Sequence, residues 1–262
     1  MNQDVTDKTE RYTIQSIDKA LDLLELLAEH GTLSLIELTE LLEQPKSSTY
    51  RIVLTLENRG FISRSDEDGK YCLGYKQLML TRNLLERSSL RAAALPEMKK
   101  LSEQYGDTVN LGVLLDGQVL YVEIIESTHP LRMTDSIGSR SPFHATAIGK
   151  AIAAKLPADE ARRLAGRYGL KPLTPNTIQS PERFAEELQR IREQGCALDD
   201  EEIVEGARCV AAAVLDPDGR PVGAISLSGA MHRFKAERLP EISAQVREAA
   251  MNVSRKLGYA PQ

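Results

Sequence analysis

Three short amphipathic segments, followed at once by two short extended ones, constrain the fold of the first quarter of the chain more than any other feature. Apolar residues recur at helical spacing in segments 16–31 and 34–44, which predicts two helices. Segment 45–60 predicts a third helix, which Pro45 begins and Gly60 ends. Because only a few residues separate the second helix from the third, the order is that of a helix-turn-helix motif.

Capping signals mark the ends of these helices. Ser16 is the expected N-cap of the first helix, and Gly31 is its expected C-terminal stop. Ser34, with Glu37 three residues later, has the pattern of a capping box. The sequences FISRSD and KYCLG, joined by a Glu-Asp-Gly turn, predict a β-hairpin directly after the third helix. Residues 12–74 therefore predict a winged helix-turn-helix domain.

The third helix has an apolar face and a polar face. The residues expected in the core are Thr49, Ile52, Val53 and Leu56. A recognition helix packs one face on its domain and presents the other to the edges of the DNA bases. Arg51 is the best candidate for a bidentate contact to guanine. Phosphate contacts near the helix start are expected from Ser47, Ser48 and Tyr50. The residues predicted to contact DNA are Lys46, Ser47, Ser48, Tyr50, Arg51, Thr55 and Arg64.

Charge favours a focused contact with duplex DNA. The net charge of the chain is −5, which argues against indiscriminate binding to nucleic acid. The basic residues of segment 44–64 are Lys46, Arg51, Arg59 and Arg64, and its one acidic residue is Glu57. Such a small basic face binds weakly, so we expect a homodimer or homotetramer that reads the half-sites of a partly palindromic operator. A small helical domain of another purpose, with its charges merely solvated, is the alternative.

Residues 75–89 predict a linking helix, and residues 90–262 predict a second domain in which strands and helices alternate. The runs NLGVLL, QVLYVEII, CVAAAVLD and PVGAISLS predict strands. Asp116-Gly117 and the sequence DPDG at 216–219 are turn sequences between strands, which implies antiparallel hairpins. Helices are expected at 90–105, 145–168, 181–194 and 235–257. The predicted fold class is α+β, with flanking helices on an antiparallel sheet.

The stretch IGSRSPFHATAIGKA at 137–151 ends like a phosphate-binding loop but lacks two of its residues. That loop needs a glycine five residues before its Gly-Lys pair and a Ser or Thr directly after it. His144 and Ala151 occupy those two positions. We therefore expect a loop that enters a helix of small residues, with Lys150 at the surface or in a dimer contact.

No motif points to catalysis, a metal or a cofactor. A grouping of His144 with Asp199 and one of the nucleophiles Cys209, Ser226 or Ser228 stays open, although no nucleophile elbow is present. The three cysteines form no CxxC pair and no ligand set, which favours reduced thiols. The chain has no run of 18 apolar residues and no signal-peptide pattern, so a cytoplasmic protein without membrane contact is expected.

Taken together, these motifs resemble the isocitrate lyase regulator (IclR) family of bacterial transcription factors. The resemblance runs from about Tyr12 to Gly258 and includes IGSRSPFHATAIGKA, DDEEIVEGARCVAAAV and VGAISLSG in the order and spacing of the family. It implies a C-terminal domain similar to GAF and PAS sensors, which binds a small metabolite, often a carboxylic acid. It also implies oligomerisation through the N-terminal part and the linking helix. The pieces LRM at 131–133 and TAIGK are similar to the sugar-acid branch, that of the 2-keto-3-deoxygluconate regulator.

The resemblance also implies where the metabolite binds. The implied effector-binding residues are Met133, His144, Ala147, Ile148, Asp199, Cys209, Ser226 and Ser228. The sequence is compatible with this, because Ser226 and Ser228 lie two apart in a strand and face the same side. A helix that begins near Ala147 would offer free N–H groups to an anion. The alternatives are that the small residues only allow close packing, that Cys209 is a small buried apolar residue, and that DDEE is a solvated turn.

The function expected from the sequence is therefore transcriptional regulation, more specifically repression, with operator affinity controlled by a small carboxylate bound in the C-terminal domain. Two other functions stay open at this point. One is a constitutive DNA-binding protein whose C-terminal domain only oligomerises. The other is a small-molecule enzyme with a fused DNA-binding module.

Overall fold

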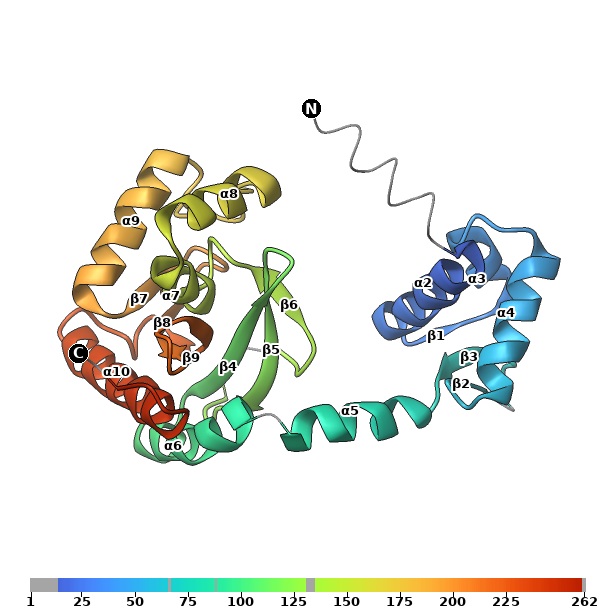
Figure 1. Ribbon diagram of the computed structural model, residues 1–262, viewed down its shortest axis with the longest axis horizontal. Coiled ribbons are helices and arrows are strands. Elements are labelled where there is room, and N and C mark those ends of the chain that lie inside the picture. Colours follow the sequence, from blue (N-terminus) through green and yellow to red (C-terminus); the bar gives the residue numbers. More distant parts are fainter. Residues whose placement is uncertain (1–13, 66, 88, 131–134, 261–262) are drawn as a thin grey trace. The chain divides into compact units, whose positions relative to one another are not determined.

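A computed structural model describes residues 14–65, 67–87, 89–130 and 135–260 of the chain. Its contacts divide the chain into two compact units, Met1–Arg87 and Ser88–Gln262. Figure 1 labels the elements of both units. Within the described part of the chain, no helix is long and apolar enough to cross a membrane.

The N-terminal unit packs three helices, α2 (Gln15–His30), α3 (Leu35–Leu41) and α4 (Lys46–Asn58), against a small antiparallel sheet (Figure 1). The strands are β1 (Thr32–Leu33), β2 (Ile62–Arg64) and β3 (Tyr71–Leu73), in the spatial order β1-β3-β2. Strands β2 and β3 form the predicted hairpin, and the two-residue strand β1, which the sequence did not indicate, pairs with β3.

The helix ends follow two of the three capping signals. Ser34 Oγ accepts a hydrogen bond from the backbone N–H of Glu37, whose carboxylate accepts one from the N–H of Ser34, so the capping box is present. Gly31 ends α2 with φ of 77°, a conformation that glycine adopts without steric cost. The prediction that Ser16 caps α2 is wrong, because the helix already begins at Gln15 and its N-cap residue, Ile14, provides no side-chain bond.

Helix α2 has two apolar faces, of which the unit buries one. Leu23 and Leu27 lie in the core, whereas Ile17 and Leu21 are each 53% exposed. Helix α5 (Lys76–Arg87) also exposes large apolar side chains; those described are Leu78, Met79 and Leu80. Contiguous exposed apolar side chains of this kind mark surfaces that contact a partner.

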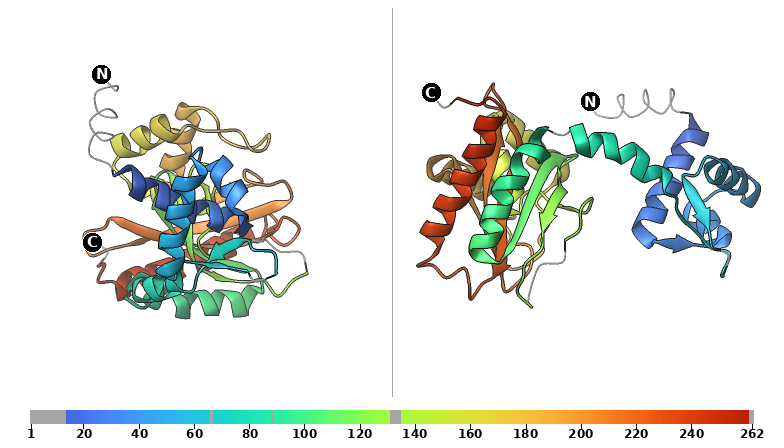
Figure 2. Two further views of the ribbon diagram at one scale, coloured as in Figure 1. Left: turned by 90° about the vertical axis from the view of Figure 1, so that its right-hand side faces the viewer. Right: turned by 90° about the horizontal axis from the view of Figure 1, so that it is seen from below.

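The C-terminal unit is a six-stranded antiparallel sheet with helices on both faces (Figures 1 and 2). Its strands are β4 (Thr108–Leu115), β5 (Gln118–Ile125), β6 (Arg140–Pro142), β7 (Ala197–Asp200), β8 (Ala207–Leu215) and β9 (Pro221–Ala230), in the spatial order β6-β5-β4-β9-β8-β7. Helices α6 (Ser89–Tyr105) and α10 (Leu239–Lys256) pack on one face. Helix α7 (Ala147–Lys155) packs on the other, with α8 (Ala158–Tyr168) and α9 (Pro181–Gln194) against it. The predicted α+β class with an antiparallel sheet is confirmed.

Two local sequences account for the turn between β4 and β5 and for the break between α7 and α8. Asp116 and Gly117, with φ of 50° and 71°, form the tight turn between β4 and β5, as the Asp-Gly pair predicts. The single helix predicted over 145–168 is wrong, because Pro157 separates α7 from α8. The residue before a proline is driven to extended backbone, and Leu156 accordingly has ψ of 155°.

Candidate functional site

The exposed face of α4 carries most of the side chains predicted to contact DNA. Thr49 and Val53 are buried in the unit, which turns the opposite face of the helix outward. The exposed residues of the predicted set on α4 are Lys46, Ser47, Tyr50, Arg51 and Thr55, and Ser48 is half-buried. The Arg51 guanidinium makes no hydrogen bond or ion pair with any other residue that the structure describes, so its donors are all free for a ligand.

Two other residues of that set are engaged within the unit. Thr55 Oγ1 donates to the carbonyl oxygen of Arg51 at 2.7 Å, which leaves the hydroxyl only as an acceptor. Arg64 Nε donates to the carbonyl oxygen of Gly69 at 3.0 Å, and the guanidinium lies 5.6 Å from the centroid of the Tyr71 ring. Arg64 therefore holds the turn of the hairpin and keeps only its remaining N–H groups for a phosphate.

In the C-terminal unit, a small cavity of about 30 Å³ lies where the start of α7 meets the sheet. Six residues implied by the resemblance line it: Ala147, Ile148, Asp199, Cys209, Ser226 and Ser228. The lining residues that the sequence did not indicate are Tyr121, Asp135, Ser141, Thr146 and Ile203. Met133 lies outside the described residues.

Strand register brings the polar lining residues together. Asp199 on β7 pairs with Cys209 on β8, and Cys209 pairs with Ser228 on β9. Residues directly opposite one another in an antiparallel sheet project from the same face. Ser226 lies two residues before Ser228 on β9 and shares that face. The four side chains come from three consecutive strands and thus form one continuous polar patch under α7.

The start of α7 supplies the opposite wall. Thr146 Oγ1 caps the helix by accepting the N–H of Gly149 at 3.0 Å. The N–H groups of Ala147 and Ile148 precede the first intrahelical bonds and have no carbonyl partner in the helix. A Cβ atom on Gly149 would lie 2.1 Å from the carbonyl oxygen of Phe143, so only glycine lets α7 begin this close to the preceding loop.

The cavity is lined by carboxyl groups and no cationic side chain among the described residues. Burial raises the pKa of Asp199 to about 6, and burial also raises the pKa of Asp135. Asp199 Oδ1 accepts the backbone N–H of Glu202 at 2.8 Å. Burial raises the pKa of the Cys209 thiol as well, so the thiol stays neutral. An anion in this cavity must therefore be stabilised by backbone N–H groups and hydroxyls.

His144 is not among the side chains that line the cavity, so the geometry does not support its predicted contact with the effector. The residue is 2% exposed, and its Nε2 lies 3.0 Å from the carbonyl oxygen of Lys171. Burial lowers the pKa of His144, which keeps the imidazole neutral. The ring is used to hold the segment around Lys171 and not to present a base to Ser226, as the catalytic alternative requires.

The prediction that Lys150 lies at the surface is wrong. Its side chain is fully buried in α7, a helix whose residues from Ala147 to Ala154 are all buried. Lys150 Nζ forms an ion pair with Glu202, lies 3.5 Å from Glu187 Oε1, and donates to the carbonyl oxygen of Leu198 at 2.6 Å. Burial raises the pKa of Glu202 to about 7 despite the ammonium beside it.

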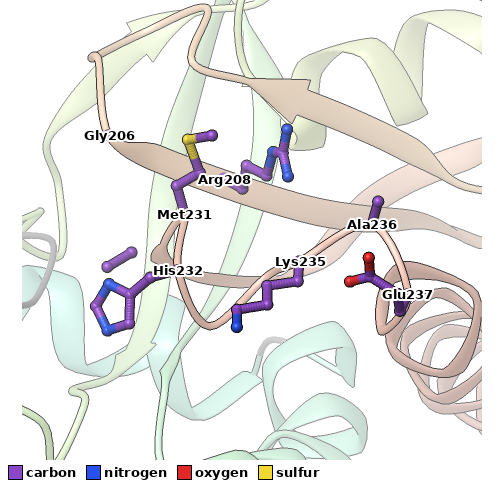
Figure 3. A pocket seen from close by; sticks show the side chains of 8 residues that line it. Gly206, Arg208, Met231, His232, Lys235, Ala236 and Glu237 are labelled. Atoms are coloured by element: carbon purple, nitrogen blue, oxygen red, sulfur yellow. The ribbon is translucent and has the colours of Figure 1, made fainter.

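A second, larger hollow of about 610 Å³ opens at the surface near the start of β8 and the end of β9. Figure 3 shows Met231, His232 and Lys235 along the turn that borders it. Its most buried cation is already paired, because Arg208 Nε bonds Asp200 Oδ1 at 2.5 Å and Arg208 Nη1 bonds the Phe234 carbonyl at 3.0 Å. The small cavity at α7 is therefore the better candidate for a specific ligand. Nowhere in the described ranges do three or more His, Cys, Asp or Glu side chains form a metal-binding group.

Comparison with known proteins gives similar chains over nearly the whole length. The transcriptional repressor IclR of Escherichia coli K12 is 35% identical over 248 residues, which cover 94% of this chain and 90% of the relative. The transcriptional regulator KdgR of the same organism is 34% identical over 247 residues, which cover 94% of each. Because the two identities are nearly equal, they do not favour the sugar-acid branch over the rest of the family.

Solved structures share the fold. The IclR structure of Thermotoga maritima has a TM-score of 0.78 and 32% identity, and the match covers 94% of this chain and 100% of that one. An IclR homolog from Microbacterium hydrocarbonoxydans, solved in complex with 4-hydroxybenzoate, has a TM-score of 0.80 at 22% identity, covering 92% and 97%. The second likeness shows the fold alone.

Family models match both units. That of the IclR helix-turn-helix domain matches residues 16–66, and that of the bacterial transcriptional regulator IclR C-terminal domain matches residues 82–255. These families and relatives are regulators of transcription, not enzymes. Together with the exposed face of α4 and the cavity at α7, these matches show that the chain belongs to the IclR family of bacterial transcriptional regulators.

Proposed function

We propose that this regulator is a cytoplasmic repressor that binds its operator as a dimer and responds to a small carboxylate bound in the cavity at α7. The polar cavity carries this proposal, because it combines free N–H groups of a helix start with two serine hydroxyls. A carboxylate fits these donors, and Asp199 accepts a hydrogen bond from a hydroxyl of the same ligand. The homolog solved with 4-hydroxybenzoate, a carboxylate that carries a hydroxyl, supports this class of effector.

The size of the cavity suggests how the effector acts. A volume of about 30 Å³ is enough for only one or two waters, since each needs at least roughly 10–15 Å³. An acid of six or more heavy atoms must therefore displace part of the wall. Ile203 is the lining residue best placed to move, because it lies in the segment between β7 and β8. The protein then has two arrangements, one with the wall in place and one with the wall displaced. The effector can change the affinity for DNA only as far as it binds one arrangement more tightly than the other.

A thermal-shift screen of organic acids and sugar acids tests the effector. A true ligand stabilises the folded protein by about 2.7 kcal/mol at a concentration of 100 Kd, which raises Tm. The same acid should change the affinity of the protein for its operator in a gel-shift or anisotropy titration. If no acid changes the operator affinity, the protein binds DNA constitutively and its C-terminal unit serves only for oligomerisation.

Ser226→Leu should block the response to the effector and leave operator binding within about twofold. The leucine fills the cavity, so overpacking lowers stability by about 1–3 kcal/mol without altering α4. The measurement is operator affinity with and without the acid that raises Tm in the screen. A variant that still responds would place the effector elsewhere.

Ile17→Glu should dissociate the dimer and weaken operator binding, because Ile17 and Leu21 form the exposed apolar face of α2. A charge at the centre of an apolar interface loses its hydration without gaining a partner. Sedimentation at micromolar concentration measures the change in mass. Ile36→Glu is the matched control, since Ile36 on α3 is 62% exposed and lies outside the α2 face. An unchanged dimer in Ile17→Glu would rule out this surface.

A further inference from the structure

A row of polar side chains on the sheet extends beyond the residues that line the cavity. Cys209 pairs with Ser228, and Ser228 pairs with Thr108 on β4. The Thr108 side chain therefore projects from the cavity face of the sheet, directly beside Ser228. Asn110, two residues further along β4, pairs with Ser226 and projects from the same face.

Thr108 and Asn110 are buried, and each keeps one polar atom without a partner. Their exposed fractions are 1% and 2%. Thr108 Oγ1 and Asn110 Oδ1 make no hydrogen bond with any residue in the described ranges. Buried polar groups are nearly always bonded, and one that is not destabilises the folded state. The chain thus keeps two destabilising oxygen atoms next to its cavity, although a valine would fill the place of Thr108 without that cost.

Asn110 also sets the direction of the serine hydrogen bonds. Its Nδ2 donates to Ser226 Oγ and to Ser228 Oγ, at 3.3 Å in each case. An amide nitrogen only donates, so both serine oxygens accept from Asn110 and keep their own hydrogens for other partners. The serine oxygens are 3.4 Å apart, so at most one hydrogen is used between them. At least one serine O–H is therefore available to an acceptor in the cavity.

We propose that Thr108 and Asn110 are specificity-determining residues of the effector site, which read oxygen acceptors on the effector from the β4 side. Asn110 orients the serine hydroxyls as donors, and Thr108 Oγ1 donates to the same oxygen-rich end of the ligand. A hydroxyl of the ligand can accept from Thr108 Oγ1 and donate to Asn110 Oδ1, and an acid without a hydroxyl within reach of β4 leaves both oxygens unpaired and is rejected. The inference rests on the proposed function and narrows it from carboxylates in general to acids with further oxygen substituents.

Thr108→Val tests this, because valine keeps the shape and β-branching of threonine and removes only the hydroxyl. The probe is whichever of pyruvate, lactate, gluconate and 4-hydroxybenzoate raises the Tm of the unaltered chain most. We expect the Tm of the ligand-free variant to rise by about 2–4 °C, and its Kd for the probe, measured by calorimetry, to weaken at least tenfold. A hydroxyl with a purely structural role would instead lower Tm when removed.

Thr177→Val is the matched control for the change in Tm. Thr177 is also a buried threonine, at 5% exposed, but its hydroxyl donates to the carbonyl oxygen of Glu202 at 2.7 Å. Its removal should lower Tm. Asn110→Leu should likewise weaken probe binding at least tenfold, because it removes the donor to both serine oxygens.

The outcomes separate this inference from the proposed function. If Thr108→Val binds the probe with unchanged Kd, or if its Tm falls as in the control, the proposed role of β4 is wrong. The proposed carboxylate effector is not affected by that result. Failure of every acid in the panel to bind the unaltered chain contradicts the carboxylate effector, and with it this inference. A raised Tm of Thr108→Val together with weaker binding of the probe supports both the role of β4 and the carboxylate effector.

Discussion

Arg51→Ala should abolish specific operator binding while the protein stays folded and still binds its effector. Arg51 lies at the centre of the exposed face of α4 and has no partner within the part of the chain that the structure describes. A bidentate contact from arginine to guanine contributes about 1–3 kcal/mol of discrimination, and a dimer loses it at both half-sites. The loss over both half-sites is about 2–6 kcal/mol, so specific affinity should fall by about 30- to 20,000-fold. What remains is the sequence-independent binding to any duplex.

Two affinities of the variant are measured at the same salt concentration and compared, one for the operator and one for an unrelated duplex. The operator is obtained first, by selecting bound sequences with the unaltered chain. Arg59→Ala is the matched control, because it removes an equal charge from an exposed position just past the end of α4. That variant should weaken binding to both duplexes alike. A footprint of Arg51→Ala that matches the unaltered protein would show that another residue reads the bases.

The position and buried face of helix α4 were predictable because the information for them is local. The 100° step of a helix is enough to place Thr49 and Val53 inward and Arg51 outward, and the structure has this arrangement. The tight turn at Asp116-Gly117 was predictable for a similar reason, since few residue pairs tolerate positive φ at both positions. In both cases, residues adjacent in sequence decide the local conformation.

The cavity was only partly predictable, because its walls come from distant segments. Ser226 and Ser228 stand out in sequence by their spacing, but nothing in the TVN sequence at 108–110 indicates that Thr108 and Asn110 lie beside them. That arrangement follows from the register between β4 and β9, which lie more than a hundred residues apart. The wrong expectation for Lys150 has the same origin, since its partner Glu202 is 52 residues away. One local signal was available: a helix that is apolar all round is buried, and a lysine within it must be paired.

Lys150→Met is expected to be the most destabilising single change among those considered for the C-terminal unit. Methionine has a similar length and leaves little empty space, so the loss comes from charge. It leaves Glu202, which is 6% exposed, without its cation, and it removes the donor to the Leu198 carbonyl. Breaking a buried ion pair by removing one partner costs about 3–5 kcal/mol. The lining residues Asp199 and Ile203 flank Glu202 in sequence, so effector affinity should fall as well.

The pH dependence identifies the cause. Burial already raises the pKa of Glu202 to about 7, and loss of the ammonium raises the pKa further. A carboxyl whose pKa is higher in the folded state binds more protons there than in the unfolded chain, so stability falls as pH rises from about 4.5 through 7. Lys150→Met should therefore be least destabilised near pH 5 and most destabilised at pH 8. Calorimetric unfolding at pH 5, 7 and 8, with the two units followed as separate transitions, measures this.

Lys155→Met separates the buried charge from the substitution itself. Lys155 lies on the same helix as Lys150 but is exposed, so its replacement should change stability by less than about 0.5 kcal/mol at every pH. Adding Glu202→Gln to Lys150→Met removes the stranded carboxylate and should restore part of the stability and flatten its dependence on pH. If Lys150→Met and Lys155→Met had the same free energy of unfolding, the ion pair of Lys150 would not stabilise the contact between α7 and the segment from Asp199 to Ile203. Another interaction would then have to hold this wall of the cavity in place.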